Sequence, residues 1–446
     1  MQPPDNFLNA LAEALGDGVW QAEEVIARAR TRLGRRYRWL PALIKRALQA
    51  FGECPQPTAL RAFLVADKAL ARCYAAAIER GEAWPAMLAL RRHVAPVAPL
   101  WLPTTSALPS LHNCDQLAAY LGLSPRQLSW LADDYRDQVL QSPGPRQHYN
   151  YRWVAKRAGG YRLIEAPKSR LKAIQREILC GILDGVPPHC AAHGFRSGHD
   201  TQTFVSPHVR QCLVLRLDLR QFFPSIGRAQ VAAIFRALGY GEHVASLLAR
   251  LCTNAVPDAI WYAEELRGTS REARERRMLS RYHLPQGSPT SPALANLAAY
   301  SLDCRLQGLA ESAGGRYTRY ADDLLFSGDE SFARGAKRLA TAIATIALEE
   351  GFEVHYRKTR LMRQGVRQHA AGLVLNEKPN IDRRDYDRLK AILHNCVRHG
   401  PTSQNHRADP YFRVSLQSHI AYVRQVHRAH GEKLQRMFER IVWNAT

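Results

Sequence analysis

Residues 316–329 read RYTRYADDLLFSGD, and two adjacent aspartates, Asp322 and Asp323, stand between two short apolar and aromatic runs. This pattern predicts a β-hairpin that carries both carboxylates at its tip. A second apolar run, residues 212–217, is followed by Asp218, so a third carboxylate ends another predicted strand. A sheet in which the two segments are neighbours brings the three side chains together.

Three converging carboxylates repel one another unless cations neutralise them, and hard oxygen ligands favour Mg²⁺. Two such ions activate a 3′-hydroxyl and stabilise a leaving pyrophosphate. We therefore expect Asp218, Asp322 and Asp323 to form a catalytic metal site for two Mg²⁺ ions, or for Mn²⁺. Asp323 is the weaker or outer ligand of the three. The Tyr-x-Asp-Asp tetrapeptide at 320–323 is a weak signal alone, because a surface turn with two aspartates is ordinary.

The charge of the chain indicates a polyanionic partner. Lysine and arginine number 62 against 40 acidic residues, which gives a formal net charge of +22. A chain this basic most often binds nucleic acid, and a solubilising surface charge is the alternative.

Other classes of site are disfavoured by the sequence. The nine cysteines are dispersed without a CxxC pair, which argues against structural zinc and fits reduced thiols in the cytoplasm. The N-terminus has no charged segment before an apolar stretch, so we expect no secretion signal. No uncharged apolar stretch reaches about 18 residues, so we expect no membrane partner.

Composition and the spacing of apolar residues divide the chain into five segments. Residues 1–94 are alanine-rich with apolar residues at helical spacing, which predicts a helical N-terminal extension. A proline-rich linker is expected at 95–110, and a helical hairpin at 111–146. From 147 onward strands alternate with helices, which indicates an α+β fold rather than a doubly wound sheet. We divide this part into 147–335 and 336–446.

Six ordered blocks resemble those of reverse transcriptases, and within them the bacterial retron-type enzymes of the group II intron-like superfamily. The resemblance covers roughly residues 106–446 and rests on YRLIEAPKSRLKAIQREIL (161–179), AHGFRSGHD (192–200), RLDLRQFFPSI (216–226), LPQGSPTSPALANL (284–297), RYADDLLFS (319–327) and GFEVHYRKTRLM (351–362). It implies a right-hand polymerase whose fingers and palm occupy 147–335. The end of the palm and a helical thumb follow, and the N-terminal helical domain is additional.

The resemblance also implies roles for further residues. It assigns nucleotide binding to Arg162, Phe223, Gln286, Gly287 and Lys358, and contact with the primer or template to Tyr320. A guanidinium is suited to clamping a triphosphate. An aromatic ring at Phe223 would clash with a 2′-hydroxyl and select dNTPs, with Phe222 in the core. Glycine at 287 allows close approach of the nucleotide. Ser288, Thr290 and Ser291 are expected to cap the helix that opens at Pro292.

The function implied is RNA-directed DNA polymerisation. A structured noncoding RNA would serve as template and primer and yield an RNA–DNA product, with an effector protein and a role in anti-phage defence. His208 matches the histidine of the retron Asn-Ala-x-x-His block, whereas Phe204 and Val205 depart from it. Group II intron, diversity-generating and CRISPR-linked reverse transcriptases are alternatives within the class. A silent RNA-binding scaffold and an RNA-dependent RNA polymerase are alternatives outside it. The sequence carries no signal for oligomeric state.

Overall fold

The computed structural model describes residues 2–16, 20–33, 37–52, 55–80, 108–132, 148–156, 160–262, 273–406 and 408–443. The chain divides into two compact units: residues 1–101, 109–140 and 235–251 form the first, and residues 102–108, 141–234 and 252–446 the second. Most of the expected linker, residues 95–107, lies outside the described ranges, as do residues 133–146 of the expected helical hairpin. No helix among the described residues is long and apolar enough to span a membrane.

The first unit is helical in its described residues. Its N-terminal part consists of α1 (Asp5–Gly16), α2 (Ala22–Leu33), α3 (Leu40–Ala50), α4 (Pro57–Ala66) and α5 (Lys68–Glu79). Helix α1 packs against α2 and α4. The apolar faces share a buried core that includes Leu8, Leu11, Leu15, Leu43 and Leu60. The apolar periodicity of these segments therefore buries one face of each helix.

Three more helices belong to this unit: α6 (Cys114–Tyr120), α7 (Pro125–Leu131) and α12 (Glu242–Cys252). The side chain of Asn113 accepts a hydrogen bond from the backbone N–H of Gln116 and starts α6, and Ser124 forms a capping box with Gln127 at α7. These caps satisfy donors that would otherwise lack partners.

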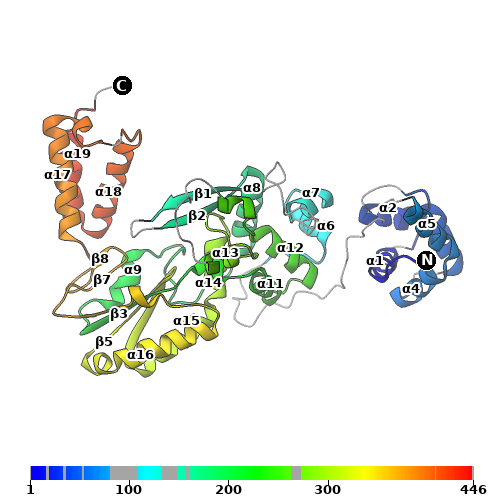
Figure 1. Cartoon of the computed structure of the whole chain (residues 1–446), viewed down its shortest axis with the longest axis horizontal. Helices are drawn as coiled ribbons and strands as arrows, with labels where there is room; N and C mark the ends of the chain where they lie inside the picture. Colours follow the sequence, from blue (N-terminus) through cyan, green and yellow to red (C-terminus); the bar gives the residue numbers. More distant parts are fainter. Residues whose placement is uncertain are drawn as a thin grey trace. The chain divides into compact units, whose positions relative to one another are not determined.

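The second unit is built on an antiparallel sheet with the strand order β4-β5-β3-β6. Its strands are β3 (Leu213–Asp218), β4 (Gly315–Tyr320), β5 (Asp323–Gly328) and β6 (Arg360–Arg363). Helices α15 (Tyr300–Ser312) and α16 (Glu330–Glu349) pack against each other and against the sheet (Figure 1). Because the expected division at 335 falls inside α16, we propose that this whole helix belongs to the palm.

A separate hairpin, β1 (Tyr149–Ala155) with β2 (Tyr161–Pro167), pairs in antiparallel register. The remaining helical elements of the second unit are α8 (Ser169–Ile178), η2 (Leu179–Leu183), α9 (Thr201–Val205), η3 (Ser206–His208), α10 (Phe222–Ser225), α11 (Arg228–Ala237, which runs into the first unit), η4 (Asp258–Tyr262), α13 (Ala273–Leu279), α14 (Ser291–Ala298), η6 (Tyr356–Lys358) and η7 (Pro401–Ser403).

Three C-terminal helices form a bundle with its own core (Figure 1). They are α17 (Arg383–His399), α18 (Phe412–Val426) and α19 (Arg428–Glu439), and they follow a small sheet of β7 (His369–Ala370), β8 (Leu373–Val374) and β9 (Asn380–Ile381). Gly431 lets α19 approach α18 closely, because a Cβ there would lie 2.2 Å from the Cα of Arg424. We propose that the thumb begins at α17.

The imidazole ring of His208 is buried and contacts side chains on two strands of the main sheet. Its side chain is fully buried, with Nδ1 2.7 Å from Oγ of Ser327 on β5 and Nε2 2.8 Å from Oγ1 of Thr318 on β4. Burial lowers the pKa of His208 to about 3, and the positive charge of Arg316 adds to this effect. The ring is therefore neutral in the folded protein at any pH near neutrality.

This buried ring predicts a loss of stability in mild acid. Between pH 6.5 and about 3 the unfolded chain binds a proton at His208 that the folded chain excludes. The free energy of unfolding should therefore fall by about 1.4 kcal/mol per pH unit on account of this residue. Urea unfolding at pH 7.5 and pH 5.5 measures it, with His208→Gln as the control. Equal pH dependence in the two proteins would contradict the prediction.

Candidate active site

The predicted hairpin and its pairing with the Asp218 strand are both present. Strand β4 ends at Tyr320, β5 begins at Asp323, and these two residues pair across the two-residue turn Ala321-Asp322. Asp218 and Asp323 are direct cross-strand partners on β3 and β5. The backbone N–H of Leu219 donates to the carbonyl oxygen of Asp322 at 2.8 Å, which fixes the turn beside the end of β3. The three aspartates thus share one end of the sheet.

A cavity of about 680 Å³ opens at this end of the sheet. Six of the nine predicted site residues line it: Arg162, Asp218, Phe223, Gln286, Asp322 and Lys358. Within the described part of the chain, Asp323, Gly287 and Tyr320 are not among its lining residues. These six residues come from five of the six sequence blocks, and Phe195 of the block 192–200 also lines the cavity, so all six blocks contribute to it.

The carboxylates that share this end of the sheet have different partners. Asp323 accepts three hydrogen bonds from the guanidinium of Arg216, at 2.8 to 3.1 Å. Asp218 accepts two from Nζ of Lys358, at 2.8 and 2.9 Å. Both basic side chains are partly exposed, so these ion pairs hold orientation more than they add stability.

Burial, followed by the neighbouring charges of Asp218 and Asp323, raises the pKa of Asp322 to about 6. Burial also raises the pKa of Asp323, although Arg216 opposes the rise. The ionised form of Asp322 is therefore disfavoured in the folded protein. A bound cation would lower this electrostatic cost, as is typical of a functional site.

The donor set fits divalent cations through Asp218 and Asp322. Both aspartates line the cavity, and the two oxygens of Asp218 bind one cationic group, the ammonium of Lys358. In the described residues no three or more Asp, Glu, His or Cys side chains stand together as one metal-binding group. The oxygens of Asp323 are bound by Arg216, which supplies its counter-charge.

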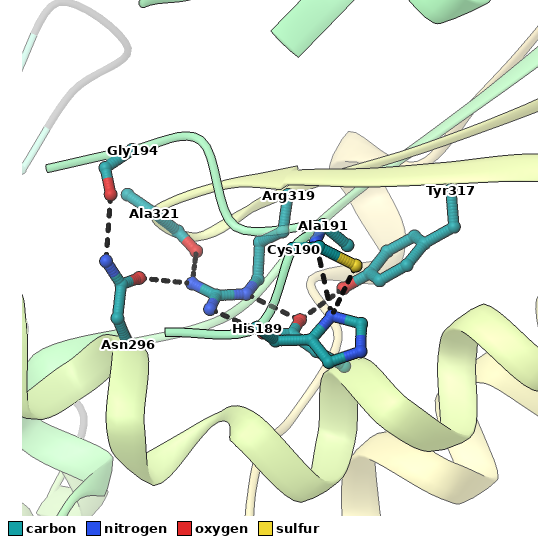
Figure 2. A network of polar contacts seen from close by, with 9 residues as sticks. His189, Cys190, Ala191, Gly194, Asn296, Tyr317, Arg319 and Ala321 are labelled. Carbon is teal, nitrogen blue, oxygen red and sulfur yellow. Dashed lines mark hydrogen bonds and ion pairs between the residues drawn. The ribbon is translucent and has the colours of Figure 1, made fainter. Parts of the chain in front are cut away.

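A buried polar network holds the Ala321-Asp322 turn (Figure 2). Arg319 on β4 and Asp303 on α15 are both fully buried and form a two-point ion pair at 2.7 and 2.8 Å. The guanidinium of Arg319 also donates to the carbonyl of Ala321 at 3.1 Å and to the side chain of Asn296 at 3.0 Å. Tyr317 donates to Asp303 at 2.8 Å. The backbone that carries Asp322 is therefore anchored to α14 and α15.

The same network reaches the loop of the second fingers block. Asn296 donates to the carbonyl of Gly194 at 2.8 Å. A Cβ on Gly194 would lie 2.6 Å from the backbone nitrogen of Ala321, so only glycine allows this contact. Ala321 itself has φ +54°, a strained value for a residue with a side chain. The turn is held in this conformation by its surroundings.

Gly287 has a structural requirement in addition to its expected role. Its φ is +136°, and a Cβ there would lie 2.8 Å from the carbonyl oxygen of Glu165 on β2. The backbone N–H of Glu165 donates to the carbonyl of Gln286 at 2.9 Å. The absent side chain of Gly287 therefore lets the Gln286 segment dock on the strand that carries Arg162.

The side chain of Glu165 is itself buried and fully engaged. It lies 2.9 Å from Nε2 of His283 and accepts a hydrogen bond from Asn254 at 2.7 Å. This network fixes β2 to the segment that precedes Gln286, so the two walls of the cavity keep their spacing.

The helix-capping expectation for the residues before Pro292 is wrong. Helix α14 starts at Ser291 after Thr290, whose side chain makes no capping hydrogen bond. The hydroxyl of Ser288 donates to Gln175, and that of Ser291 donates to the carbonyl of Pro285. These buried hydroxyls satisfy partners elsewhere in the fold instead of the first turn of the helix.

The two phenylalanines at 222 and 223 differ in burial. Phe222 is buried at 4% exposure, and Phe223 is partly exposed beside it with ring centroids 5.7 Å apart. Tyr320 packs against the buried ring of Phe204 at 5.6 Å.

Sequence reasoning missed Arg216, Arg319, Asp303 and Asn296. Charged residues within apolar strands, such as Arg216 and Arg319, are the signal that could have found them.

Comparison with known proteins gives the relatives of this chain. Residues 154–383 match the family model described as Reverse transcriptase (RNA-dependent DNA polymerase). Retron Mx65 reverse transcriptase of Myxococcus xanthus is 39% identical over 337 residues, which cover 74% of this chain and 72% of that protein. Retron Mx162 reverse transcriptase of the same organism is 35% identical, with 65% and 60% covered. Retron Ec86 reverse transcriptase of Escherichia coli is 30% identical, with 64% and 79% covered.

Proposed function

The chain belongs to the retron-type reverse transcriptases and is an RNA-directed DNA polymerase, and from this premise we propose how its site works. Nucleotidyl transfer takes place in the cavity that Asp218 and Asp322 line, with a structured noncoding RNA as template and primer. The observation that carries the proposal is that both carboxylates line one cavity with Arg162, Phe223 and Gln286.

Two divalent cations, Mg²⁺ by preference, would supply the activation of the primer hydroxyl and the stabilisation of the leaving pyrophosphate when bound. Asp218 and Asp322 would hold them, and Asp323 would act from outside, since Arg216 occupies its oxygens. Arg162, on β2 at the wall of the cavity, clamps the triphosphate. The ammonium group of Lys358 pairs with Asp218 in this structure. With a cation bound to Asp218 instead, Lys358 would contact the phosphates.

The aromatic ring of Phe223 selects the sugar. It lines the cavity and is partly exposed, whereas Phe222 beside it belongs to the core. A ring packed under the sugar leaves no room for a 2′-hydroxyl, so the product is DNA.

Replacing Phe223 by alanine should therefore admit ribonucleotides. We expect the preference for dNTPs over NTPs, expressed as the ratio of kcat/KM values, to fall by about 100-fold. Single-nucleotide incorporation on an RNA template measures it. Phe223→Tyr is the matched control and should keep the preference, because it retains the ring. An unmodified protein that prefers NTPs would support an RNA-dependent RNA polymerase instead.

The thumb bundle is proposed to bind the growing RNA–DNA duplex. Exposed arginines lie on each of its three helices, including Arg383 and Arg388 on α17, Arg424 on α18 and Arg436 on α19. Such side chains contact phosphates without reading sequence, so the grip suits any template.

The nucleic acid bound in the native cell tests the proposal directly. Sequencing it after isolation of the chain should yield one noncoding RNA species joined to its own DNA copy, with priming from a 2′-hydroxyl of that RNA. Asp322→Asn should yield the RNA without DNA. Many unrelated RNAs without attached DNA in both proteins would favour the silent scaffold.

A role in anti-phage defence with an effector protein is the part of the proposal that rests on family resemblance alone. Plaque counts on cells that carry the native locus test it, with Asp322→Asn as the control. Equal protection by both proteins would separate defence from DNA synthesis.

A further inference from the structure

Phe195 is an exposed aromatic side chain on the wall of the active cavity. It is 50% exposed and lines the cavity together with Asp218 and Asp322. Its backbone has φ +59°, in the left-handed region, which is a genuine outlier for a bulky residue. Half of this residue's surface is therefore open to solvent, although the backbone that carries it is strained.

The ring lies next to two residues that are expected to meet the substrates. Its centroid is 6.0 Å from that of Phe223 and 6.4 Å from that of Tyr320. The first is the proposed sugar-selecting ring, and the second belongs to the catalytic hairpin. Phe195 therefore lies where the incoming nucleotide and the primer end must meet.

The surrounding structure fixes the backbone on which this ring is carried. Gly194, the preceding residue, is in close backbone contact with Ala321 and accepts a hydrogen bond from Asn296. Asn296 is in turn held by the buried Arg319. The loop of Phe195 and the turn of Asp322 are thus anchored to one network, which keeps the ring at a fixed place beside the reacting groups.

We propose that Phe195 stacks on the base of the primer-terminal nucleotide and holds it in line for attack. Every base offers a planar face, so a stacking ring serves any sequence. The inference rests on the proposed roles of Phe223 and Tyr320. It assigns to the second fingers block a direct substrate contact.

Phe195→Asn tests the ring apart from the backbone, because asparagine tolerates a left-handed φ. On a short DNA primer annealed to an RNA template, we expect kcat/KM for the next dNTP to fall by about 10- to 100-fold, the range of stacking effects. The unfolding temperature should stay within ~2 °C of the original, because relief of strain offsets the lost ring contacts. Phe195→Tyr should restore incorporation.

Arg210→Asn is a matched control at another left-handed residue, φ +58°, that does not line the cavity. It should leave incorporation unchanged.

Primers with an abasic terminal position decide which base the ring contacts. On such a primer the original protein and Phe195→Asn should incorporate equally slowly, since no base remains to stack. On a template with an abasic templating position, the original protein should still incorporate the dNTP faster than Phe195→Asn. The proposal would be overturned if the two proteins became equal on this template instead, or if Phe195→Tyr incorporated as slowly as Phe195→Asn. Asp322→Asn tests the proposed metal site separately and should be inactive on every primer. Activity of this variant would contradict the metal-site proposal and not the stacking proposal.

Discussion

Asp322→Asn should lower DNA synthesis by about 1,000-fold while RNA binding and folding are retained. Asp322 lines the cavity, and the change removes a charge without changing the shape of the side chain. Loss of one ligand to catalytic cations costs several kcal/mol in the transition state, and about 4 kcal/mol corresponds to this factor. Primer extension on an RNA template measures the rate, and filter binding measures RNA affinity.

The stability of the same variant gives a second readout. Burial and the charges of Asp218 and Asp323 disfavour the ionised form of Asp322 and raise its pKa to about 6. Removal of the charge should therefore leave the unfolding temperature unchanged or higher. A variant that loses activity because it unfolds would contradict this explanation.

Asp323→Asn is the matched control in the neighbouring position. Its oxygens bind Arg216 and are not part of the cavity lining, so the expected loss is about 10- to 100-fold, the effect of an outer residue on a metal ligand. Equal losses at both positions would show that Asp323 leaves Arg216 and binds the cation directly.

Asp303→Asn should lower the free energy of unfolding of the second unit by about 3–5 kcal/mol, the effect of breaking a buried ion pair from one side. Arg319 and Asp303 are fully buried, so the variant leaves a guanidinium charge without its counter-ion. Urea unfolding measures the loss. Synthesis should also fall at temperatures where the variant remains folded, because Arg319 holds the carbonyl of Ala321 in the turn that carries Asp322.

Arg305→Ala provides the control on the same helix. Arg305 lies two residues from Asp303 in α15 and pairs with Glu349 and Glu350 at the protein surface. Exposed pairs contribute at most about 1 kcal/mol, so this variant should be near neutral in both assays. Similar losses in the two variants would mean that burial does not set the energetic cost here.

The sequence by itself determined the local elements and the order of the blocks. The short apolar and aromatic runs on either side of Asp322 and Asp323 predicted the hairpin, and the apolar run before Asp218 predicted its neighbour strand. Both were present, because short apolar runs bounded by a polar turn are encoded over a few adjacent residues. The same logic located the N-terminal helices from their apolar periodicity, and the ordered blocks indicated the reverse transcriptase family.

Only the tertiary structure decided which partners the charged residues, the glycines and the buried hydroxyls have. Asp218 meets Lys358 from 140 positions away, and Asp323 turns to Arg216. A Cβ on Gly287 would meet Glu165 on β2, and the hydroxyl of Ser288 donates to Gln175, 113 positions away, instead of capping α14. Such pairings depend on which surfaces the packed core brings together, and side-chain partners distant in sequence leave no periodic signal. Phe195 belongs to this second group, since its exposure and strain exist only in the folded chain.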